Sequence, residues 1–265
     1  MGMPTKTILL TFDVEEFDTP LLHNIPIPMS EQMRISQEGL LNICALLKRL
    51  GQPVCTFYTT ANYALHFPET IIDLSKQHEI ASHTYYHSTF KPSDIHDSKI
   101  CLEGIIGKEI AGFRMPNMAA FDKRLIHQAG YQYDSSINPT WLPGKYNYLK
   151  YPLHPFSYFD TMEIPVSVVP YLRFPLFWLS FKNLPLWLYI QLCNFTLART
   201  GCLHLYFHPW EFADLSMFRI PGFIRNPDGI QLVNKLEKFI RYYQARSDVK
   251  FERTFDYIKP FILTN

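Results

Sequence analysis

Short apolar runs alternate with longer segments of helical periodicity along most of the chain. The first run, residues 7–12, is largely apolar, which is typical of a strand buried on both faces. A helix then begins at Ser30 or Ser36, carries its apolar residues at helical spacing, and stops at Gly51. The same criteria predict strands at 54–58, 79–82, 111–113, 131–134, 202–207 and 249–254, and helices at 68–77, 92–102, 121–129, 186–200 and 229–246.

This alternation is typical of βαβ units, and it predicts an α/β fold with a parallel sheet. The length of 265 residues suits one large domain or two small ones, and we expect a single domain over residues 1–265. In such folds the functional groups lie at the carboxyl ends of the strands. Asp13, Glu15, Thr59 and His83 all fall at predicted strand ends, so we expect them to share one edge of the sheet.

Two histidines, His83 and His87, are spaced for metal binding. Residues four apart can share one face of a helical turn and direct both imidazoles at one point. A carboxylate from Asp13-Val14-Glu15 would complete three ligands and leave a coordination position open for water. The chain has 10 histidines, so such a pair can arise by chance, and a carboxylate after a strand often only caps a helix. The hypothesis therefore depends on several such features occurring together.

Composition excludes some classes of protein. Apolar residues make up 47% of the chain and charged residues 18%, which argues against disorder. The formal net charge of +1 gives no basis for nucleic-acid binding. The five cysteines form no C-x2-C pair, so we expect reduced thiols and no cysteine zinc site. The N-terminus has no pattern typical of an export signal, and we expect a cytoplasmic protein.

An aromatic region over residues 168–198 could suggest a membrane segment, but Arg173, Lys182 and Asn183 interrupt it. No stretch reaches the roughly 18–20 uninterrupted apolar residues of a spanning helix. We therefore expect no transmembrane span, and we interpret residues 168–187 as core plus a hydrophobic lip. Peripheral contact with a membrane or a lipid-linked substrate remains open.

Five motifs occur in a particular order: TFDVE at 11–15, EIASHTYYH at 79–87, FRMP at 113–116, YQYDSS at 131–136 and LYFHP at 205–209. Together they resemble the polysaccharide deacetylase family, the NodB-like esterases of carbohydrate esterase family 4. The resemblance covers residues 7 to about 211, and the second motif is the most specific. It implies a distorted (β/α) barrel.

The resemblance also implies roles for six residues. Asp13 would be the catalytic base, Arg114 would hold Asp13 ionised, and His208 would be the catalytic acid. Glu15, His83 and His87 would bind a divalent metal. Zinc suits these ligands best, although cobalt, nickel or iron could use the same set.

The first motif departs from the common family pattern of two adjacent aspartates. Val14 occupies the second position here, and we assign the ligand role to Glu15 because some relatives carry a D-x-[DE] arrangement. Glu16 is the alternative carboxylate. A relative that has lost its activity is also consistent with this departure.

Four further residues are candidates for substrate binding: Tyr86, Pro116, Asp134 and Trp210. The two aromatic side chains could stack on sugar faces. Asp134 could instead orient His208 or Arg114, or cap a turn. No role is assigned to Glu211, and His204 is interpreted as a surface or packing residue.

The favoured function is a metal-dependent hydrolase that removes N- or O-acetyl groups from a carbohydrate. The substrate would be a cytoplasmic sugar or a lipid-linked glycan intermediate, and the aromatic lip favours an apolar tail. The alternatives are an allantoinase-like hydrolase of ureide C–N bonds and an inactive carbohydrate-binding relative. The oligomeric state is left open.

Overall fold

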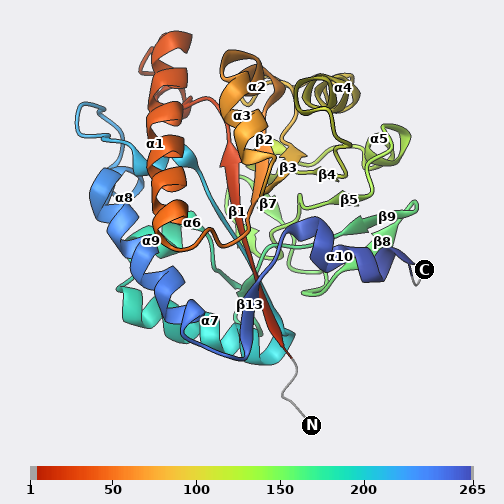
Figure 1. Ribbon diagram of the computed structural model, residues 1–265, viewed down its shortest axis with the longest axis vertical. Coiled ribbons are helices and arrows are strands. Elements are labelled where there is room, and N and C mark those ends of the chain that lie inside the picture. The colour runs from red at the N-terminus through yellow and green to blue at the C-terminus, as the bar shows by residue number, and fades with distance from the viewer. Residues whose placement is uncertain (1–4, 264–265) are drawn as a thin grey trace.

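The computed structural model, which describes residues 5–263, contains a mostly parallel sheet of nine strands (Figure 1). The strand order is β12-β1-β2-β3-β4-β5-β9-β8, and β13 pairs with the first residues of β1. Within this sheet of the described residues, β8 and β9 form the only antiparallel pair. The strands are β1 (Lys6–Val14), β2 (Thr56–Thr59), β3 (Glu79–Ser82), β4 (Gly112–Phe113), β5 (Tyr133–Asp134), β8 (Phe156–Tyr158), β9 (Thr161–Glu163), β12 (Cys202–Phe207) and β13 (Val249–Phe251).

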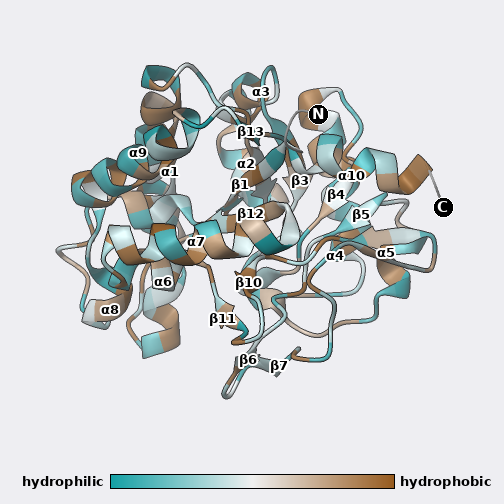
Figure 2. Cartoon of the chain, turned by 90° about the horizontal axis from the view of Figure 1, so that it is seen from below, coloured by the Kyte–Doolittle hydropathy of each residue, from teal (hydrophilic) through white to brown (hydrophobic). Residues whose placement is uncertain are grey.

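Helices cover the sheet. In Figure 1, α1 and α9 lie on one side of β1. In chain order, α2 and α3 follow β2, α4 follows β3 and α5 follows β4. Both α1 and α9 alternate apolar and polar residues (Figure 2), and their buried residues belong to the same core as those of β1 and β12. The helices are α1 (Met29–Arg49), α2 (Ala61–His66), α3 (Pro68–Leu74), α4 (Asp94–Ile106), α5 (Arg124–Gln128), α6 (Trp178–Asn183), α7 (Leu186–Thr200), α8 (Gly222–Arg225), α9 (Gly229–Gln244) and α10 (Thr254–Leu263).

The predicted α/β alternation and the parallel sheet are confirmed. Three elements, β3, α7 and β12, have the bounds that the sequence predicts. The helix predicted from Ser30 or Ser36 begins at Met29. Four of the described helices were not predicted: α2, α6 and α8 have only four to six residues each, and α10 contains Pro260. Among residues 5–263, no helix combines the length and the apolarity needed to cross a bilayer.

Two small hairpins and a short helix make up much of the aromatic region after β5. The hairpins are β6 (Trp141–Leu142) with β7 (Tyr146–Asn147), and β10 (Val168–Val169) with β11 (Phe174–Pro175). They lie close to each other (Figure 2), and the Thr140 hydroxyl donates a hydrogen bond of 2.6 Å to the Arg173 carbonyl. Helix α6 follows, so this region forms one structure over the carboxyl ends of the strands.

A close helix–loop contact places the loop after β12. A Cβ atom at Gly39 of α1 would lie 1.8 Å from the carbonyl oxygen of Pro209, so only glycine allows this approach. Pro209 begins the short 3-10 helix η3 (Pro209–Phe212), directly after His208. The packing of α1 therefore fixes the segment that carries the candidate acid.

Candidate active site

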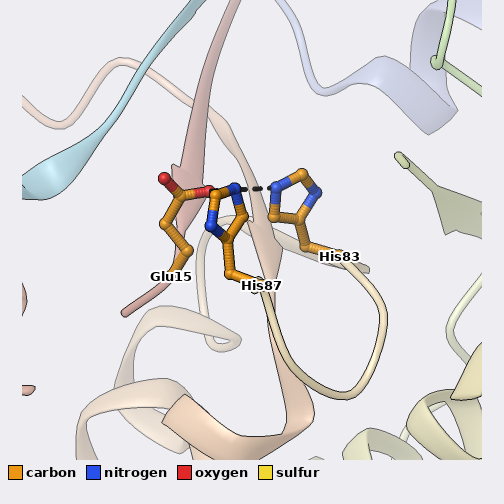
Figure 3. A group of neighbouring side chains, drawn as sticks. All are labelled: Glu15, His83 and His87. Atoms are coloured by element: carbon orange, nitrogen blue, oxygen red, sulfur yellow. Dashed lines mark hydrogen bonds and ion pairs between the residues drawn. The ribbon is translucent and has the colours of Figure 1, made fainter. Parts of the chain in front are cut away.

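Glu15, His83 and His87 converge at the carboxyl edge of the sheet (Figure 3). Glu15 directly follows β1, and the two histidines lie in the loop that follows β3. The Nε2 atoms of both histidines are 3.1 Å from Glu15 Oε2. One ligand atom from each side chain lies within 4.8 Å of the other two, a spacing that could hold a metal ion.

The two histidines meet through a loop, so the expectation of a helical turn is wrong. Thr84 has a φ of 64°, in the left-handed region, and turns the chain just after His83. The first backbone N–H groups of α2, from Ala61 and Asn62, donate to the carbonyls of Thr84 and Tyr85 at 3.0 and 2.9 Å. The first N–H groups of a helix have no partner within the helix, and here two of them hold the loop in place.

Hydrogen bonds to the far side of each imidazole orient both rings. His83 Nδ1 donates to the Arg114 carbonyl at 2.8 Å, and His87 Nδ1 lies 2.7 Å from Asp18 Oδ2. With Nδ1 used in this way, Nε2 is the ring atom that faces Glu15 in both histidines, and it is the atom that would bind a metal. Asp18 was not predicted, because nothing in its spacing separates it from the other acidic residues after β1.

Glu15, and not Glu16, faces the histidines. Trp210 Nε1 donates to Glu15 Oε1 at 3.1 Å, and the Ser36 hydroxyl donates to the Glu15 carbonyl at 2.5 Å. Burial alone would raise the pKa of Glu15, but the nearby histidines, His87 first, lower it to about 2. Glu16 instead accepts hydrogen bonds from Thr60 and Asn62, away from the two histidines.

Asp13 and Arg114 form a buried ion pair beside this cluster. Arg114 Nη1 lies 2.6 Å from Asp13 Oδ1, and its side chain is completely buried. Burial would lower the pKa of Arg114, but Asp13 more than offsets this effect, and the pKa is raised above its usual value. Arg114 also donates to Thr11 and Ser135, and its guanidinium lies 3.8 Å from the ring centre of Tyr58. The guanidinium is therefore held toward Asp13 from several sides.

His204 is a site neighbour that the sequence did not reveal. Arg114 Nη2 donates to His204 Nε2 at 2.9 Å, and His204 is 1% exposed. Burial, and then the positive charge of Arg114, lower the pKa of His204 well below its usual value, so the ring stays neutral and can accept this bond. His204 lies between the core residues Leu203 and Leu205 on β12, so the sequence alone suggested a packing residue.

His208 reaches the same cavity from the end of β12. Its Nε2 lies 4.0 Å from Glu15 Oε1, and its ring stacks on Trp210 with a centroid distance of 5.2 Å. Burial would lower the pKa of His208, but Glu15 and then Glu211 offset it, and the pKa is raised. The positively charged form is the one that a general acid needs.

A cavity of about 390 Å³ opens above these groups. Asp13, Glu15, His83, His87 and His208 form its polar side. The remaining wall is mostly apolar and comes from segments far apart in the sequence; it includes Leu22, Met118, Leu142, Pro143, Phe177, Trp178, Leu179, Phe223 and Ile224.

The four predicted substrate-binding residues have different positions. Trp210 lines the cavity, but it is 2% exposed and bound to Glu15. Tyr86 and Pro116 are not among the cavity-lining residues, and Tyr86 is 40% exposed. Asp134 is completely buried away from the cavity, where it interacts with Lys123, Tyr158 and Ser136.

Asp134 is linked to the loop that follows Arg114 through Ser136. The hydroxyl of Ser136 donates to Asp134 and accepts the backbone N–H of Met115 at 2.8 Å. This chain of bonds supports the loop that follows Arg114. Among the described residues, Asp134 has no hydrogen bond or ion pair with His208 or Arg114, the two groups that it could have oriented, and its substrate-binding role stays a prediction.

Comparison with known proteins identifies the family. The family model for polysaccharide deacetylase matches residues 2–133, which include the pair Asp13 and Arg114 and the cluster of Glu15, His83 and His87. The chain belongs to the polysaccharide deacetylase family. No curated protein sequence matches this family member.

Solved structures agree with this fold. A protein from Mycobacterium smegmatis described as a polysaccharide deacetylase is 20% identical to this chain, with a TM-score of 0.67. The match covers 100% of this chain and 93% of that protein. The Puue allantoinase is 17% identical with a TM-score of 0.62, over 98% and 91% of the two chains. A pseudoenzyme of carbohydrate esterase family 4 from Bacillus anthracis is 13% identical with a TM-score of 0.53, over 95% and 65%. The predicted fold class, the distorted (β/α) barrel of this family, is thereby confirmed.

Proposed function

We propose that this chain is a metal-dependent hydrolase that removes an acetyl group from a nitrogen or oxygen of a carbohydrate. The observation that carries the proposal is the meeting of three groups around one cavity. These are the Asp13–Arg114 pair, the Glu15, His83 and His87 cluster, and His208. A base, a metal site and an acid are the parts that hydrolysis of an amide or ester needs.

The donor set fits a divalent metal. Two imidazole Nε2 atoms face one carboxylate oxygen, and hydrogen bonds from both Nδ1 atoms fix the rings. Zinc suits two imidazoles and one carboxylate, and cobalt, nickel or iron accept the same ligands. When bound, such an ion supplies Lewis acidity, which polarises a carbonyl and makes a nearby water more acidic.

The residues of the chain account for the proton transfers. Asp13, held in place by its ion pair with Arg114, takes a proton from the attacking water. His208 gives a proton to the leaving nitrogen or oxygen as the C–N or C–O bond breaks, and acetate is the second product. Each of these acid–base groups contributes about 10²–10⁴-fold to the rate.

The first test is acetate release from acetylated sugars, lipid-linked glycans and aryl acetates, with allantoin as a further substrate. We expect the metal-loaded protein to release acetate, and Asp13→Asn to lower kcat by about 10²–10⁴-fold because the amide cannot accept the water's proton. Metal content should be the same in both proteins, since Asp13 is outside the ligand set. Acetate release that is unchanged in Asp13→Asn would contradict the role of the base.

The same panel separates the two alternatives. Turnover of allantoin without release of acetate would favour a ureide hydrolase, the activity after which the Puue allantoinase is named. A protein that holds no metal and turns over no substrate would favour an inactive relative like the Bacillus anthracis pseudoenzyme. The cavity of about 390 Å³ and its apolar wall favour a substrate larger than a ureide.

We further propose that the substrate carries an apolar group next to its sugar, as a lipid-linked glycan does. Much of the cavity wall beyond the acid–base groups is apolar, although Asn117 and Lys145 also line it, and the apolar part includes Leu22 and Phe223, which are 67% and 56% exposed. Phe177, Trp178 and Leu179 from the predicted hydrophobic lip belong to this wall. Exposed apolar side chains at a cavity mouth also suit contact with a lipid surface.

Leu22→Asp is expected to raise the KM for a lipid-linked substrate roughly tenfold, because a buried leucine contributes about 1.5–3 kcal/mol and about 1.4 kcal/mol is a factor of ten. The KM for a short soluble acetylated sugar should not change. Leu41→Asp is the matched control, since Leu41 is 53% exposed on α1 and is not among the cavity-lining residues. Equal effects of the two variants, or none for Leu22→Asp and for Leu179→Asp, would remove the support for an apolar tail.

A further inference from the structure

His208 is held by a carboxylate that the mechanism above does not use. One oxygen of Glu211, Oε1, accepts the backbone N–H of His208 at 2.8 Å and lies 3.1 Å from its ring Nδ1. Glu211 is completely buried, in the 3-10 turn that begins after His208. With Nδ1–H bound to Glu211, the ring has one orientation, and its Nε2 faces the cavity.

The second oxygen of Glu211 faces a buried lysine. Lys182 Nζ, from α6, lies 3.8 Å from Glu211 Oε2, and both side chains are 0% exposed. Among the described residues, neither of these two atoms has a hydrogen-bond partner. A separation of 3.8 Å is too long for a hydrogen bond, so the interaction is one of charge.

Burial of a lysine in this way is unfavourable for the folded state unless its charge interacts with another group. Burial lowers the pKa of Lys182, and Glu211 opposes that shift. Taking an ammonium group out of water is unfavourable, and a nearby carboxylate offsets this only in part. A buried lysine without hydrogen bonds therefore points to a function for its charge rather than to fold stability.

We propose that Lys182 and Glu211 form a positioning pair for the acid His208. Lys182 faces one oxygen of Glu211 and holds that side chain in place, and the other oxygen of Glu211 fixes the orientation of the His208 ring and the proton on Nδ1. Helix α6 also contributes Trp178, whose ring packs edge-on against His208 with a centroid distance of 5.2 Å. The inference rests on the proposed hydrolase function, because it assigns the pair to the leaving-group step of that reaction.

The test compares two leaving groups in one protein. An N-acetylated sugar leaves as an amine and needs the proton from His208, whereas the phenolate of an aryl acetate leaves without it. We expect Glu211→Gln to slow deacetylation of the N-acetylated sugar by about 10–100-fold, while aryl acetate hydrolysis changes less than about twofold. Metal content should stay at the wild-type level.

Lys182→Met, which nearly preserves volume, should give the same selective loss in smaller measure. The double variant should be no slower than Glu211→Gln alone, since Lys182 acts through Glu211. Lys235→Met is the matched control: Lys235 also contacts α6, through the carbonyl of Lys182, and its loss should leave the ratio of the two rates unchanged.

Three outcomes would overturn the pair. These are a parallel loss of both rates in Glu211→Gln, an unchanged ratio, or additive losses in the double variant. The ring ¹⁵N shifts of His208, compared between wild type and Glu211→Gln, test the fixed Nδ1 proton without any turnover. If wild type released no acetate from either substrate, the proposed function itself would fail, while the ¹⁵N shifts would still test the pair.

Discussion

Replacing His83 by alanine is expected to remove metal binding and acetyl hydrolysis together. His83 is 1% exposed, its Nε2 faces Glu15, and its Nδ1 is bound to the Arg114 carbonyl, so no neighbouring side chain can replace it. Several kcal/mol of transition-state stabilisation would be lost with the ion, which corresponds to roughly a 10³-fold lower kcat. Metal analysis of the purified variant and acetate release measure the two effects.

Thermal unfolding gives an independent readout of the same site. Added zinc should raise the Tm of the stripped wild-type protein, because a ligand that binds only the folded state stabilises it, and it should not raise the Tm of His83→Ala. His96→Ala is the control, since the His96 side chain is 62% exposed on α4. A His83→Ala protein with a full complement of metal would show that the ion binds elsewhere.

Replacing Arg114 by methionine is expected to cause the largest loss of stability in the chain. Arg114 is completely buried and satisfies Asp13, Thr11 and Ser135 at once. Its loss would leave Asp13 as a buried charge without a partner, which costs about 3–5 kcal/mol. Urea unfolding measures this cost, and acetate release should fall with it, because the base would lose the guanidinium that orients it.

A second substitution separates the charge effect from the loss of packing. Asp13→Asn added to Arg114→Met should recover part of the lost free energy of unfolding, since the unpaired charge is gone, but it should not recover activity. Arg124→Met is the control, because Arg124 pairs with Asp122 at a side chain that is 67% exposed. A loss below about 1 kcal/mol in Arg114→Met would contradict the importance of the buried pair.

The parts of the fold that the sequence predicted are those with a local cause. Strands β1 and β12 are apolar runs, and α7 has helical periodicity between a proline and a glycine, so each could be located from its own residues. Helix α2 and the hairpins after β5 have no such cause. The N-terminus of α2 is stabilised by the carbonyls of Thr84 and Tyr85, which come from another loop.

The candidate site shows the same division. Because they follow predicted strands, Asp13, Glu15 and His83 were expected at one edge of the sheet. In the structure all three line the same cavity. The supporting residues Asp18, His204 and Glu211 could not be assigned from spacing, because each acts through a partner distant in space or by the direction of a single turn. Asp134 was proposed for substrate binding from the family resemblance; it also ends a strand, but its carboxylate pairs with Lys123 and Tyr158, and Asp134 is not among the residues that line the cavity.

Hairpin β6–β7 contributes Leu142 and Tyr146 to the cavity wall, and α6 contributes Trp178 and Leu179, whereas Asp13, Glu15 and His208 come from β1, or directly follow β1 and β12. Under the proposed function, much of the wall that would contact a substrate thus comes from other segments than the residues assigned to the chemistry. The hairpins can be exchanged between relatives, or redesigned, without touching a residue that moves a proton. The specificity of such an enzyme could therefore diverge quickly, while its reaction stays the same.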